Sequence, residues 1–302
     1  MKVTKLLLAC TALGLAGTGG VAQAAPAKPA AQAPASAPAG KRPVISEGQR
    51  ALDMWLVQNL MSKHEFYHAA GMNLEEVDAL WVARNGPNAK TATFGSPMWV
   101  MNGIEVIRGA YGEENQRNRE KALKAIAEID PAVKNEPANL GAGHEWVMHT
   151  STTPIIEIAG DGKTAKGIWY SPGVGLMGKF SGGKVGVDAT MFFEKYAGDF
   201  IKENGEWKIW HLQMAYDFTP GLPKEMVAKV LEALGDKALT GEPAQAMAQA
   251  GERADFKLPE GFTRPVYSYP VYSPQRPGIL WPPLPEPYYT FGETFSYCNC
   301  EQ

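Results

Sequence analysis

The sequence predicts an α+β domain in which N-terminal helices pack on a strongly curved antiparallel sheet. Apolar residues recur at helical spacing between residues 46 and 81, which indicates two amphipathic helices. Segments that alternate between apolar and polar residues follow between residues 144 and 218, with turn-forming residues between them, as in hairpin-linked strands. Helices followed by a run of such strands are typical of an α+β domain.

The first helix is predicted to begin at Ser46 and to end near Ala70, before Gly71. A second helix follows, with Asn73 as its N-cap and acidic residues in its first turn. Each helix has one apolar face that can pack on a sheet. The residues of these faces are Leu52, Trp55, Leu56, Leu60 and Met61 in the first helix and Leu74, Val77, Leu80 and Trp81 in the second.

The rest of the domain is predicted to consist mainly of strands. Residues 91–103 are expected to be extended, and residues 115–128 to form a further helix. Gly160-Asp161-Gly162 and Asn204-Gly205 are strong hairpin signals, so the alternating segments form an antiparallel meander. These segments are residues 144–159, 163–171, 188–203 and 206–218.

The N-terminal part of the chain has the features of an exported protein. Residues 1–24 combine two lysines, a short apolar run and an A-x-A ending at Ala24, which is typical of a secretory signal peptide. A lipoprotein signal ending at Cys10 is the alternative, but the apolar run continues beyond that cysteine. Residues 25–43 form an Ala/Pro linker. We therefore expect a periplasmic or secreted protein.

Charge and hydropathy exclude two kinds of partner. Removal of Lys2 and Lys5 leaves 27 of the 29 basic residues against 32 acidic ones, a net charge of −5, and no basic cluster remains. Nucleic acid is therefore not an expected partner. No later run approaches the roughly 20 apolar residues that a membrane span needs.

The C-terminal part is expected to be a helical extension over residues 221–256, followed by an arm. Residues 257–302 contain nine of the 23 prolines and six tyrosines, a composition that excludes a central strand or a regular helix. We expect this arm to lie across the domain or a neighbouring subunit. Cys298 and Cys300 end it; a disulfide over such a short spacing is strained, and two thiols do not complete a zinc site. The arm is expected to have no catalytic part, with a redox pair or an intermolecular bridge as alternatives.

Three stretches resemble the SnoaL-like family of the nuclear-transport-factor-2-like (NTF2-like) superfamily: LMSKHEFYHAAGMNLEEVDALWVA, HTSTTPIIEIAGDGKTAKGIWYSPG and FFEKYAGDFIKENGEWKIWHLQMAYDF. The resemblance covers about residues 46–220, so we expect a domain at residues 44–220. It implies a cone of helices and a bent sheet around one deep pocket, and a convex face that packs against another subunit in a homo-oligomer. It also implies a cofactor-independent lyase, isomerase, dehydratase or cyclase, although many members only bind ligands.

The last strand carries polar groups on a largely apolar face. In strict alternation, Trp207, Ile209, His211, Gln213 and Asp217 share one side. We assign this side to the pocket, because a buried imidazole and a buried carboxylate need partners that a pocket provides. The other side carries Trp210, Leu212, Met214 and Tyr216, and a register error of one residue reverses the assignment.

Histidines are the candidate acid–base groups. His64 and His68 lie at i and i+4 on the first helix, a spacing that also suits a metal. No H-E-x-x-H motif occurs and Glu65 is expected to point elsewhere, so no metal is predicted. His149 or His68, paired with Asp217, is the expected base with its orienting carboxylate. A structural hydrogen bond between strand and helix is the alternative.

The expected substrate-binding residues are mostly aromatic, which favours an aromatic or polycyclic substrate. They are His64, Tyr67, Trp81, Arg84, Trp99, Trp169, Tyr170, Tyr196 and His211, with Trp55 as a further lining residue. Arg84 would anchor an anionic or phenolic group. For each aromatic residue a core position is the alternative, and for Arg84 a solvated one.

The predicted function is that of a secreted, cofactor-independent lyase or dehydratase that acts on a small aromatic molecule. No dinucleotide fingerprint, phosphate loop or G-x-S-x-G elbow occurs, so no cofactor is expected. Within the family that the chain resembles, one subgroup splits formaldehyde from lignin-derived diarylpropane diols to give stilbenes and fits an aromatic pocket. The alternative is a non-catalytic periplasmic module that binds a ligand or serves assembly.

Overall fold

A computed structural model describes residues 42–97, 99–129, 131–132, 134, 146–181, 184–218, 258–267 and 280–300. The predicted signal peptide, almost all of the linker, the helical extension and His144 lie outside these residues. From Pro43 onward the described residues belong to one compact unit. Among the helices described, none is both long enough and apolar enough to cross a bilayer.

The two predicted N-terminal helices are present. Helix α1 spans Glu47–Ala69, and the Ser46 hydroxyl accepts a hydrogen bond from the Gln49 amide at 3.1 Å, which confirms the predicted cap. Gly71 follows with a φ of +66°, a conformation that glycine adopts without strain. Helix α2 spans Asn73–Leu80 with Met72 at the N-cap, so the prediction of Asn73 as the cap was wrong by one residue.

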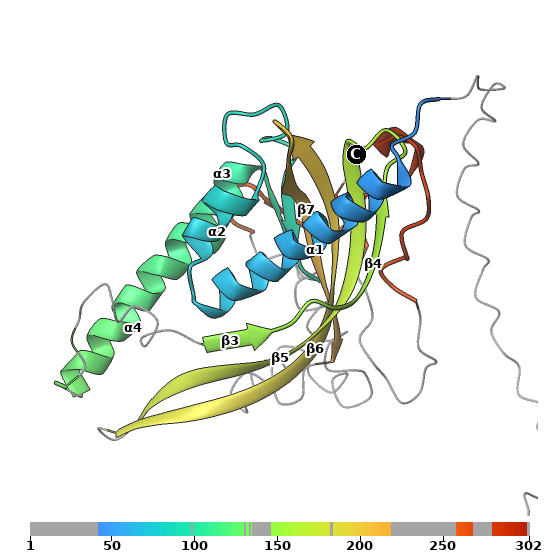
Figure 1. The fold of residues 1–302 in the computed structure, drawn as a ribbon. Coiled ribbons are helices and arrows are strands. Elements are labelled where there is room, and N and C mark those ends of the chain that lie inside the picture. Colours follow the sequence, from blue (N-terminus) through green and yellow to red (C-terminus); the bar gives the residue numbers. More distant parts are fainter. Residues whose placement is uncertain are drawn as a thin grey trace, which may run out of the picture. The chain divides into compact units, whose positions relative to one another are not determined.

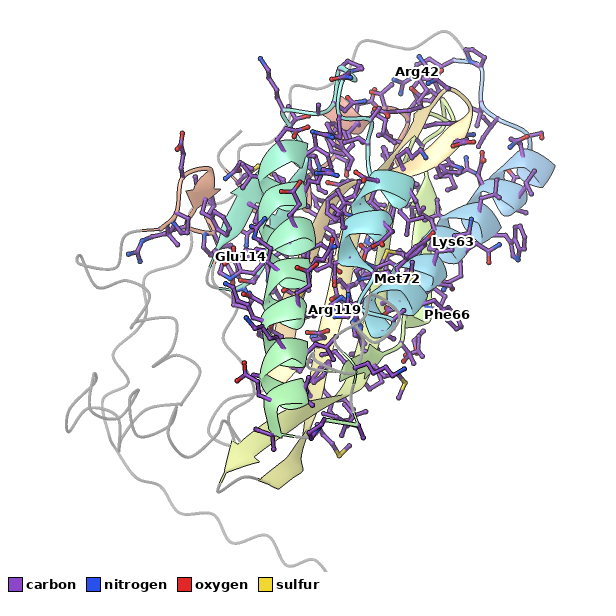
Figure 2. The ribbon with its side chains drawn as sticks, turned by 90° about the vertical axis from the view of Figure 1, so that its left-hand side faces the viewer. Arg42, Lys63, Phe66, Met72, Glu114 and Arg119 are labelled. Carbon is purple, nitrogen blue, oxygen red and sulfur yellow. A yellow bond between two sulfur atoms is a disulfide. The ribbon has the colours of Figure 1, made fainter. Side chains whose placement is uncertain are left out.

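A longer helical region than predicted spans residues 104–129. Helix α3 (Ile104–Ile107) continues into a π-helical segment, η1 (Arg108–Glu114), and then into α4 (Asn115–Ile129). Only α4 was predicted from the sequence. The π-helical segment contains Tyr111, whose side chain is buried in the interior. Figure 2 shows α1, α2 and α4 in front of the sheet.

The strands form one eight-stranded sheet in the order β3-β5-β6-β7-β1-β2-β8, with β4 also paired to β5 (Figure 1). The predicted meander and its hairpins are confirmed, but β1 pairs with β7 in parallel, so the sheet is mixed. The strands are β1 (Thr93–Gly95), β2 (Val100–Asn102), β3 (Trp146–His149), β4 (Thr152–Ile158), β5 (Thr164–Ser181), β6 (Lys184–Glu203), β7 (Glu206–Phe218) and β8 (Phe262–Thr263).

Both faces of the central strands are covered. On the inner face, which the helices cover, Trp169, Tyr196 and Phe200 belong to the main core. On the outer face, Ile168 and Ala197 pack against Tyr297 of the C-terminal segment. The described residues 280–300 therefore lie on the sheet, as expected for an arm that crosses the domain.

A β-bulge in β7 reverses the side-chain alternation of this strand. Phe200 pairs with Ile209, whereas the preceding residue, Asp199, pairs with His211, so Trp210 is an extra residue. Trp207 and Ile209 consequently face the helices, where they belong to the core. His211, Gln213 and Asp217 face outward, so their assignment to the pocket was wrong. The assignment assumed that side chains alternate strictly along the strand, and the extra residue of the bulge interrupts this alternation.

Candidate functional site

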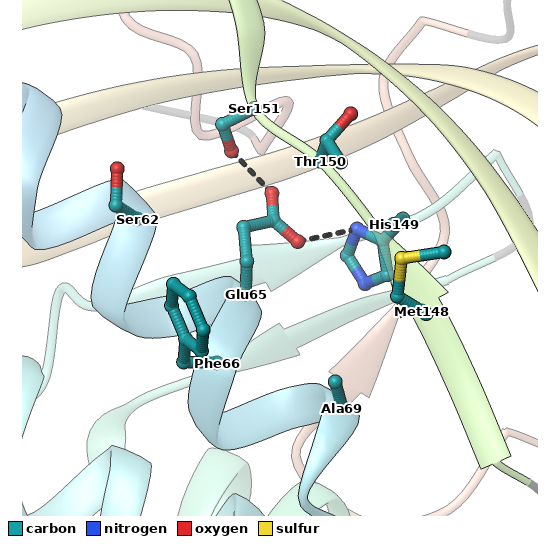
Figure 3. A pocket seen from close by; sticks show the side chains of 8 residues that line it. All are labelled: Ser62, Glu65, Phe66, Ala69, Met148, His149, Thr150 and Ser151. Carbon is teal, nitrogen blue, oxygen red and sulfur yellow. Dashed lines mark hydrogen bonds and ion pairs between the residues drawn. The ribbon is translucent and has the colours of Figure 1, made fainter.

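Three histidines from two elements meet beneath the helices. His64 and His68 come from α1 and His149 from β3, and the centroids of their rings lie 4.8–6.0 Å apart. Figure 3 shows α1 passing beside β3 at this point. Buried carboxyl groups complete the cluster; they belong to Glu65, Glu76 and Glu194.

Glu76 of α2 organises one half of the cluster. Its Oε1 accepts hydrogen bonds from His64 Nδ1 at 2.8 Å and Trp81 Nε1 at 3.3 Å, and its Oε2 accepts one from the Tyr111 hydroxyl at 2.8 Å. Burial acts to lower the pKa of His64, but Glu76 and two further carboxyl groups outweigh it and raise this pKa to about 9. A protonated His64 therefore balances the charge of Glu76 at neutral pH.

Glu65 and His149 form a buried pair. Glu65 Oε2 lies 2.6 Å from His149 Nδ1, and the Ser151 hydroxyl donates to Glu65 Oε1 (Figure 3). The Glu65–His149 contact lacks hydrogen-bond geometry, whereas Nδ1 meets that geometry with Ser171 Oγ, at 2.9 Å. Burial acts to raise the pKa of Glu65, but His149, His64 and Ser151 hold it below its usual value.

The expectation that Glu65 points elsewhere was therefore wrong. It was based on the helix alone, in which neighbouring residues face different directions. Since α1 crosses β3, the face of α1 that carries Glu65 is directed at the strand that carries His149.

Glu194 of β6 is the second carboxyl group beside the same imidazole. Its Oε1 lies 3.9 Å from His149 Nδ1. Burial and the negative charge of Glu65 raise the pKa of Glu194 to about 8, so it is mostly neutral at pH 7. One ring thus lies between a carboxylate and a carboxylic acid.

His68 belongs to the Glu76 side of the cluster. Its Nδ1 lies 2.7 Å from the Tyr111 hydroxyl and 3.2 Å from Asn73 Nδ2, and its ring stacks on that of Tyr111. The Tyr111 hydroxyl donates its hydrogen to Glu76 Oε2, and its oxygen lies within hydrogen-bond distance of His68 Nδ1. The chain His68–Tyr111–Glu76–His64 is therefore continuous.

A cavity of about 300 Å³ opens between α1 and β3 and reaches the Glu65–His149 pair. This volume is at the lower end of the range for small-molecule pockets. Phe66, with 80% of its surface exposed, lies at the side of the cavity. The lining residues are Ser62, Glu65, Phe66, Ala69, Met148, His149, Thr150 and Ser151.

Several predicted lining residues lie on the inner face but behind this cavity. Tyr196 stacks on His149, with centroids 5.5 Å apart, and Trp169 Nε1 donates to Gln58 Oε1 at 2.7 Å. Trp81 is buried against Glu76. Tyr67 and Trp99 are partly buried against the core.

Other predicted site residues lie away from the cluster, and their assignment is corrected. Tyr170 faces outward and is 49% exposed, because it is next to the inward-facing Trp169 in a strand. Arg84 forms an exposed ion pair with Glu105, and Trp55 is 60% exposed. Asp217 forms an ion pair with Lys195 on the outer face, so it does not meet His68 or His149.

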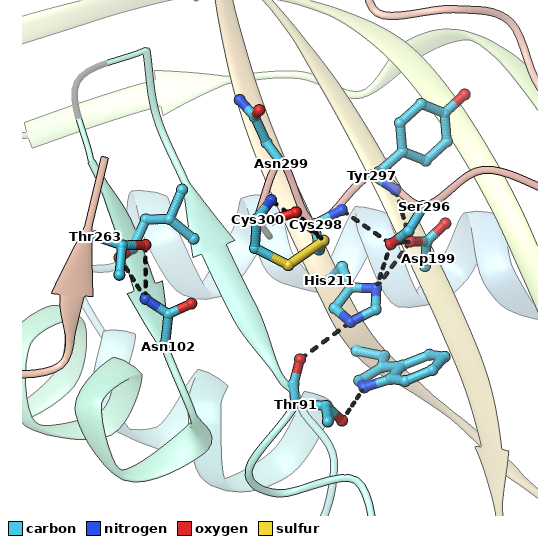
Figure 4. Close-up of a disulfide and its surroundings, with 12 residues drawn as sticks. Thr91, Asn102, Asp199, His211, Thr263, Ser296, Tyr297, Cys298, Asn299 and Cys300 are labelled. Carbon is cyan, nitrogen blue, oxygen red and sulfur yellow. Dashed lines mark hydrogen bonds and ion pairs between the residues drawn. A yellow bond between two sulfur atoms is a disulfide. The ribbon is translucent and has the colours of Figure 1, made fainter. Parts of the chain in front are cut away.

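His211 belongs to a second polar cluster, under the C-terminal segment (Figure 4). Its Nδ1 lies 2.8 Å from Asp199 Oδ2 and its Nε2 lies 3.0 Å from the Thr91 carbonyl oxygen. Asp199 also accepts hydrogen bonds from Lys166 Nζ at 2.6 Å and from Ser296 Oγ at 2.8 Å. Both ring nitrogens of His211 are thus engaged, and the cluster anchors the C-terminal segment.

The same segment contains a disulfide between Cys298 and Cys300. The cysteines are therefore joined to each other within the chain, rather than to another chain. Aromatic rings of the segment surround the ammonium group of Lys166, with Phe291 and Phe295 centroids at 4.6 and 4.7 Å.

The carboxyl groups of the inner cluster were missed in the sequence. The inward direction of Glu194 was predictable, because alternation along residues 188–203 places it on the same side of the strand as Tyr196 and Phe200. A carboxyl group on a strand face that is otherwise apolar needs partners. The contact between Glu76 and Tyr111 was not predictable, because it depends on how α2 and η1 pack.

We predict that Tyr111→Phe lowers the free energy of unfolding by about 1–3 kcal/mol, because it leaves a buried Glu76 oxygen without its donor. Urea denaturation measures this change. Tyr170→Phe, at an exposed position, is the matched control and should change stability by less than about 0.5 kcal/mol. Equal effects of the two variants would contradict the role of Tyr111.

We predict that Asp199→Asn costs on the order of 3–5 kcal/mol at pH 7, because Lys166 and His211 lose their carboxylate. Burial opposes ionisation, but Lys166 and His211 hold the pKa of Asp199 below its usual value. The extra unfolding free energy of the wild type over Asp199→Asn is therefore lost only as the pH falls below about 3.8. In that range Asp199 takes up a proton more readily in the unfolded chain than in the folded protein.

The measurement is urea denaturation of both proteins at several pH values between about 3 and 7. The control is Asp78→Asn, since Asp78 forms a surface ion pair with Arg108 and should contribute about 1 kcal/mol or less. A difference between wild type and Asp199→Asn that stays constant down to pH 3 would show that the carboxylate charge is not what stabilises this cluster.

Solved structures similar to this chain have low sequence identity. A candidate scytalone dehydratase from Novosphingobium aromaticivorans is 11% identical, with 59% of this chain and 93% of that chain covered and a TM-score of 0.42. A hexachlorocyclohexane dehydrochlorinase, LinA-type3, from Novosphingobium barchaimii is 13% identical, with 59% and 94% covered and a TM-score of 0.37. An NTF2-like superfamily protein from Salmonella enterica is 10% identical, with 58% and 97% covered and a TM-score of 0.35. Similarities of this size carry no information on the reaction.

No curated protein sequence matches the chain. The model of the SnoaL-like domain family, in contrast, matches residues 49–213, more than half of the chain. The matched residues begin in α1 and end in β7, so they include both elements that supply the histidine cluster. The chain belongs to the SnoaL-like domain family, as the sequence predicted.

Proposed function

We propose that this protein is an exported, cofactor-independent lyase that acts on a small aromatic molecule. The observation that carries the proposal is the buried Glu65–His149 pair at the wall of the cavity between α1 and β3. Membership of the SnoaL-like family agrees with small-molecule chemistry in the interior of the domain.

The pair has the parts that proton transfer needs. Nδ1 of His149 is engaged by Glu65 and Ser171, so Nε2 is the ring atom that exchanges a proton with the substrate. Nδ1 can donate to Ser171 Oγ, and the carboxylate of Glu65 stabilises the imidazolium that forms when Nε2 takes up a proton. Glu65 thus takes the role that was predicted for Asp217, and His149 is the base.

The cavity suits an aromatic substrate. Its apolar side chains, Phe66, Ala69 and Met148, can contact an aromatic ring, and the polar side chains beside them can orient the hydroxyl groups of a substrate. Tyr196 and Phe192 lie behind His149 and limit the movement of its ring.

Within this class, we propose a diarylpropane diol as the substrate. His149 takes the proton of the primary hydroxyl group. The bond between the carbon that bears this hydroxyl group and the neighbouring carbon of the substrate then breaks, which releases formaldehyde. The electrons of this bond form the double bond of a stilbene. The second hydroxyl group takes the proton back from His149 and leaves as water. The reaction is balanced without an oxidant, reductant or cofactor, since one proton is taken and one is returned.

We predict that His149→Gln and Glu65→Gln each lower kcat by about 10²- to 10⁴-fold, the usual contribution of a general acid–base group. The measurement is turnover of diaryl diols, hydroxysteroids and polyketides without added cofactor, with product identified by mass spectrometry. Glu206→Gln is the control, because Glu206 is a surface residue that pairs with Lys208.

Substrate binding to each variant, measured by calorimetry, separates catalysis from folding. A His149→Gln protein that binds the substrate and turns it over at the normal rate would rule out the pair as the acid–base group. Binding without turnover in the wild type for every compound would favour the non-catalytic ligand-binding alternative.

A further inference from the structure

We propose that His64, Glu65 and His149 form a binding site for a first-row divalent transition cation such as Zn²⁺. One ligand atom from each residue lies within 4.8 Å of the others, and all three side chains are buried. Two imidazoles and one carboxylate make up a common donor set for such cations. The proposal goes beyond the proposed function, does not depend on it, and departs from the sequence-based expectation of no metal.

His64 provides the first observation. Its Nδ1 bonds to Glu76, but its Nε2 is buried and has no hydrogen-bond partner among the described residues. A buried polar atom without a partner costs free energy. An imidazole held by a carboxylate on one nitrogen, with the other nitrogen free to bind, is the usual arrangement of a metal-binding histidine.

Glu65 provides the second observation, which is independent of the first. Ser151 holds its Oε1, whereas its Oε2 is buried without a hydrogen bond of good geometry among the described residues. That atom lies 2.6 Å from His149 Nδ1, in a contact that an ion between the two side chains would replace. Bond lengths of about 2.0–2.2 Å require ligand atoms about 3–3.5 Å apart, so the side chains need to move only slightly.

The surroundings favour a cation and allow its entry. Glu76 and Glu194 lie next to the three ligands, so the site contains an excess of carboxyl groups. Glu65 and His149 also line the open cavity, which gives an ion a path from solvent and leaves a coordination position for water or substrate (Figure 3).

Binding of a cation to Nδ1 of His149 requires this nitrogen to lose its proton, whereas proton transfer at Nε2 requires Nδ1 to keep it. The metal-bound form and the proton-transferring form are therefore alternative states of one site. Direct measurement of metal binding needs no turnover, so failure of this proposal leaves the proposed function intact, and the reverse also holds.

The test uses the full mature chain without a histidine tag, stripped with a chelator and dialysed against Zn²⁺ or Mg²⁺ at pH 7. Metal content is measured by mass spectrometry. We expect one Zn²⁺ per chain and no Mg²⁺, which prefers oxygen ligands. His64→Gln and Glu65→Gln should each weaken Zn²⁺ binding at least tenfold, and Glu76→Gln about 10- to 100-fold through the orientation of His64.

Glu206→Gln is the control, since Glu206 lies at the surface, pairs with Lys208 and is outside the group of three, and it should keep the wild-type affinity. X-ray absorption of the Zn²⁺-loaded wild type provides a readout that needs no variant, with two imidazoles and a carboxylate expected around the ion. No retained Zn²⁺, equal binding by His64→Gln and the wild type, or sulfur ligands would overturn the proposal.

Discussion

The constraint on which the rest of the structure depends is that the central strands are buried on both faces. Helices cover one face, and the C-terminal segment covers the other. A buried polar side chain on β5, β6 or β7 must therefore find a partner inside the protein, because water does not reach it. Lys166 and Asp199 meet on the outer face, and Glu194 and His149 lie together on the inner one.

The two buried clusters differ in how completely they are satisfied. On the outer face, Asp199 accepts hydrogen bonds from side chains of the sheet and of the C-terminal segment, and both nitrogens of His211 are engaged. On the inner face, His64 Nε2 and Glu65 Oε2 have no hydrogen-bond partner among the described residues. A cluster that is fully satisfied stabilises the fold, whereas one with open positions beside a cavity can bind a ligand. This difference is why the inner cluster, and not the His211 cluster, is the candidate site.

The features that were predictable from the sequence depend on local interactions. Ser46 caps α1 through a bond to a residue three positions away, and Asn204-Gly205 adopts positive φ values of 51° and 86° in its hairpin. The resemblance to the SnoaL-like family likewise gave the right architecture, since its quoted stretches lie in the elements that form the inner core.

The features that were not predictable depend on tertiary packing. One extra residue, Trp210, moved His211 and Asp217 to the outer face, and no residue type signals a bulge at this position. Glu65 was dismissed because its direction is set by the crossing of α1 over β3, which the sequence of α1 does not contain. The histidines were predicted because an imidazole is a common acid–base group near neutral pH. Their carboxyl partners were missed because carboxyl groups usually lie at the surface.

A crystal structure of the protein with a bound stilbene or diaryl diol tests the central claim most directly, namely that the cavity beside the Glu65–His149 pair is the functional site. We expect the ligand to lie between α1 and β3, with a hydroxyl oxygen within hydrogen-bond distance of His149 Nε2. A ligand bound instead in the surface depression around Arg84 and Glu105, with the inner cluster unchanged, would contradict it.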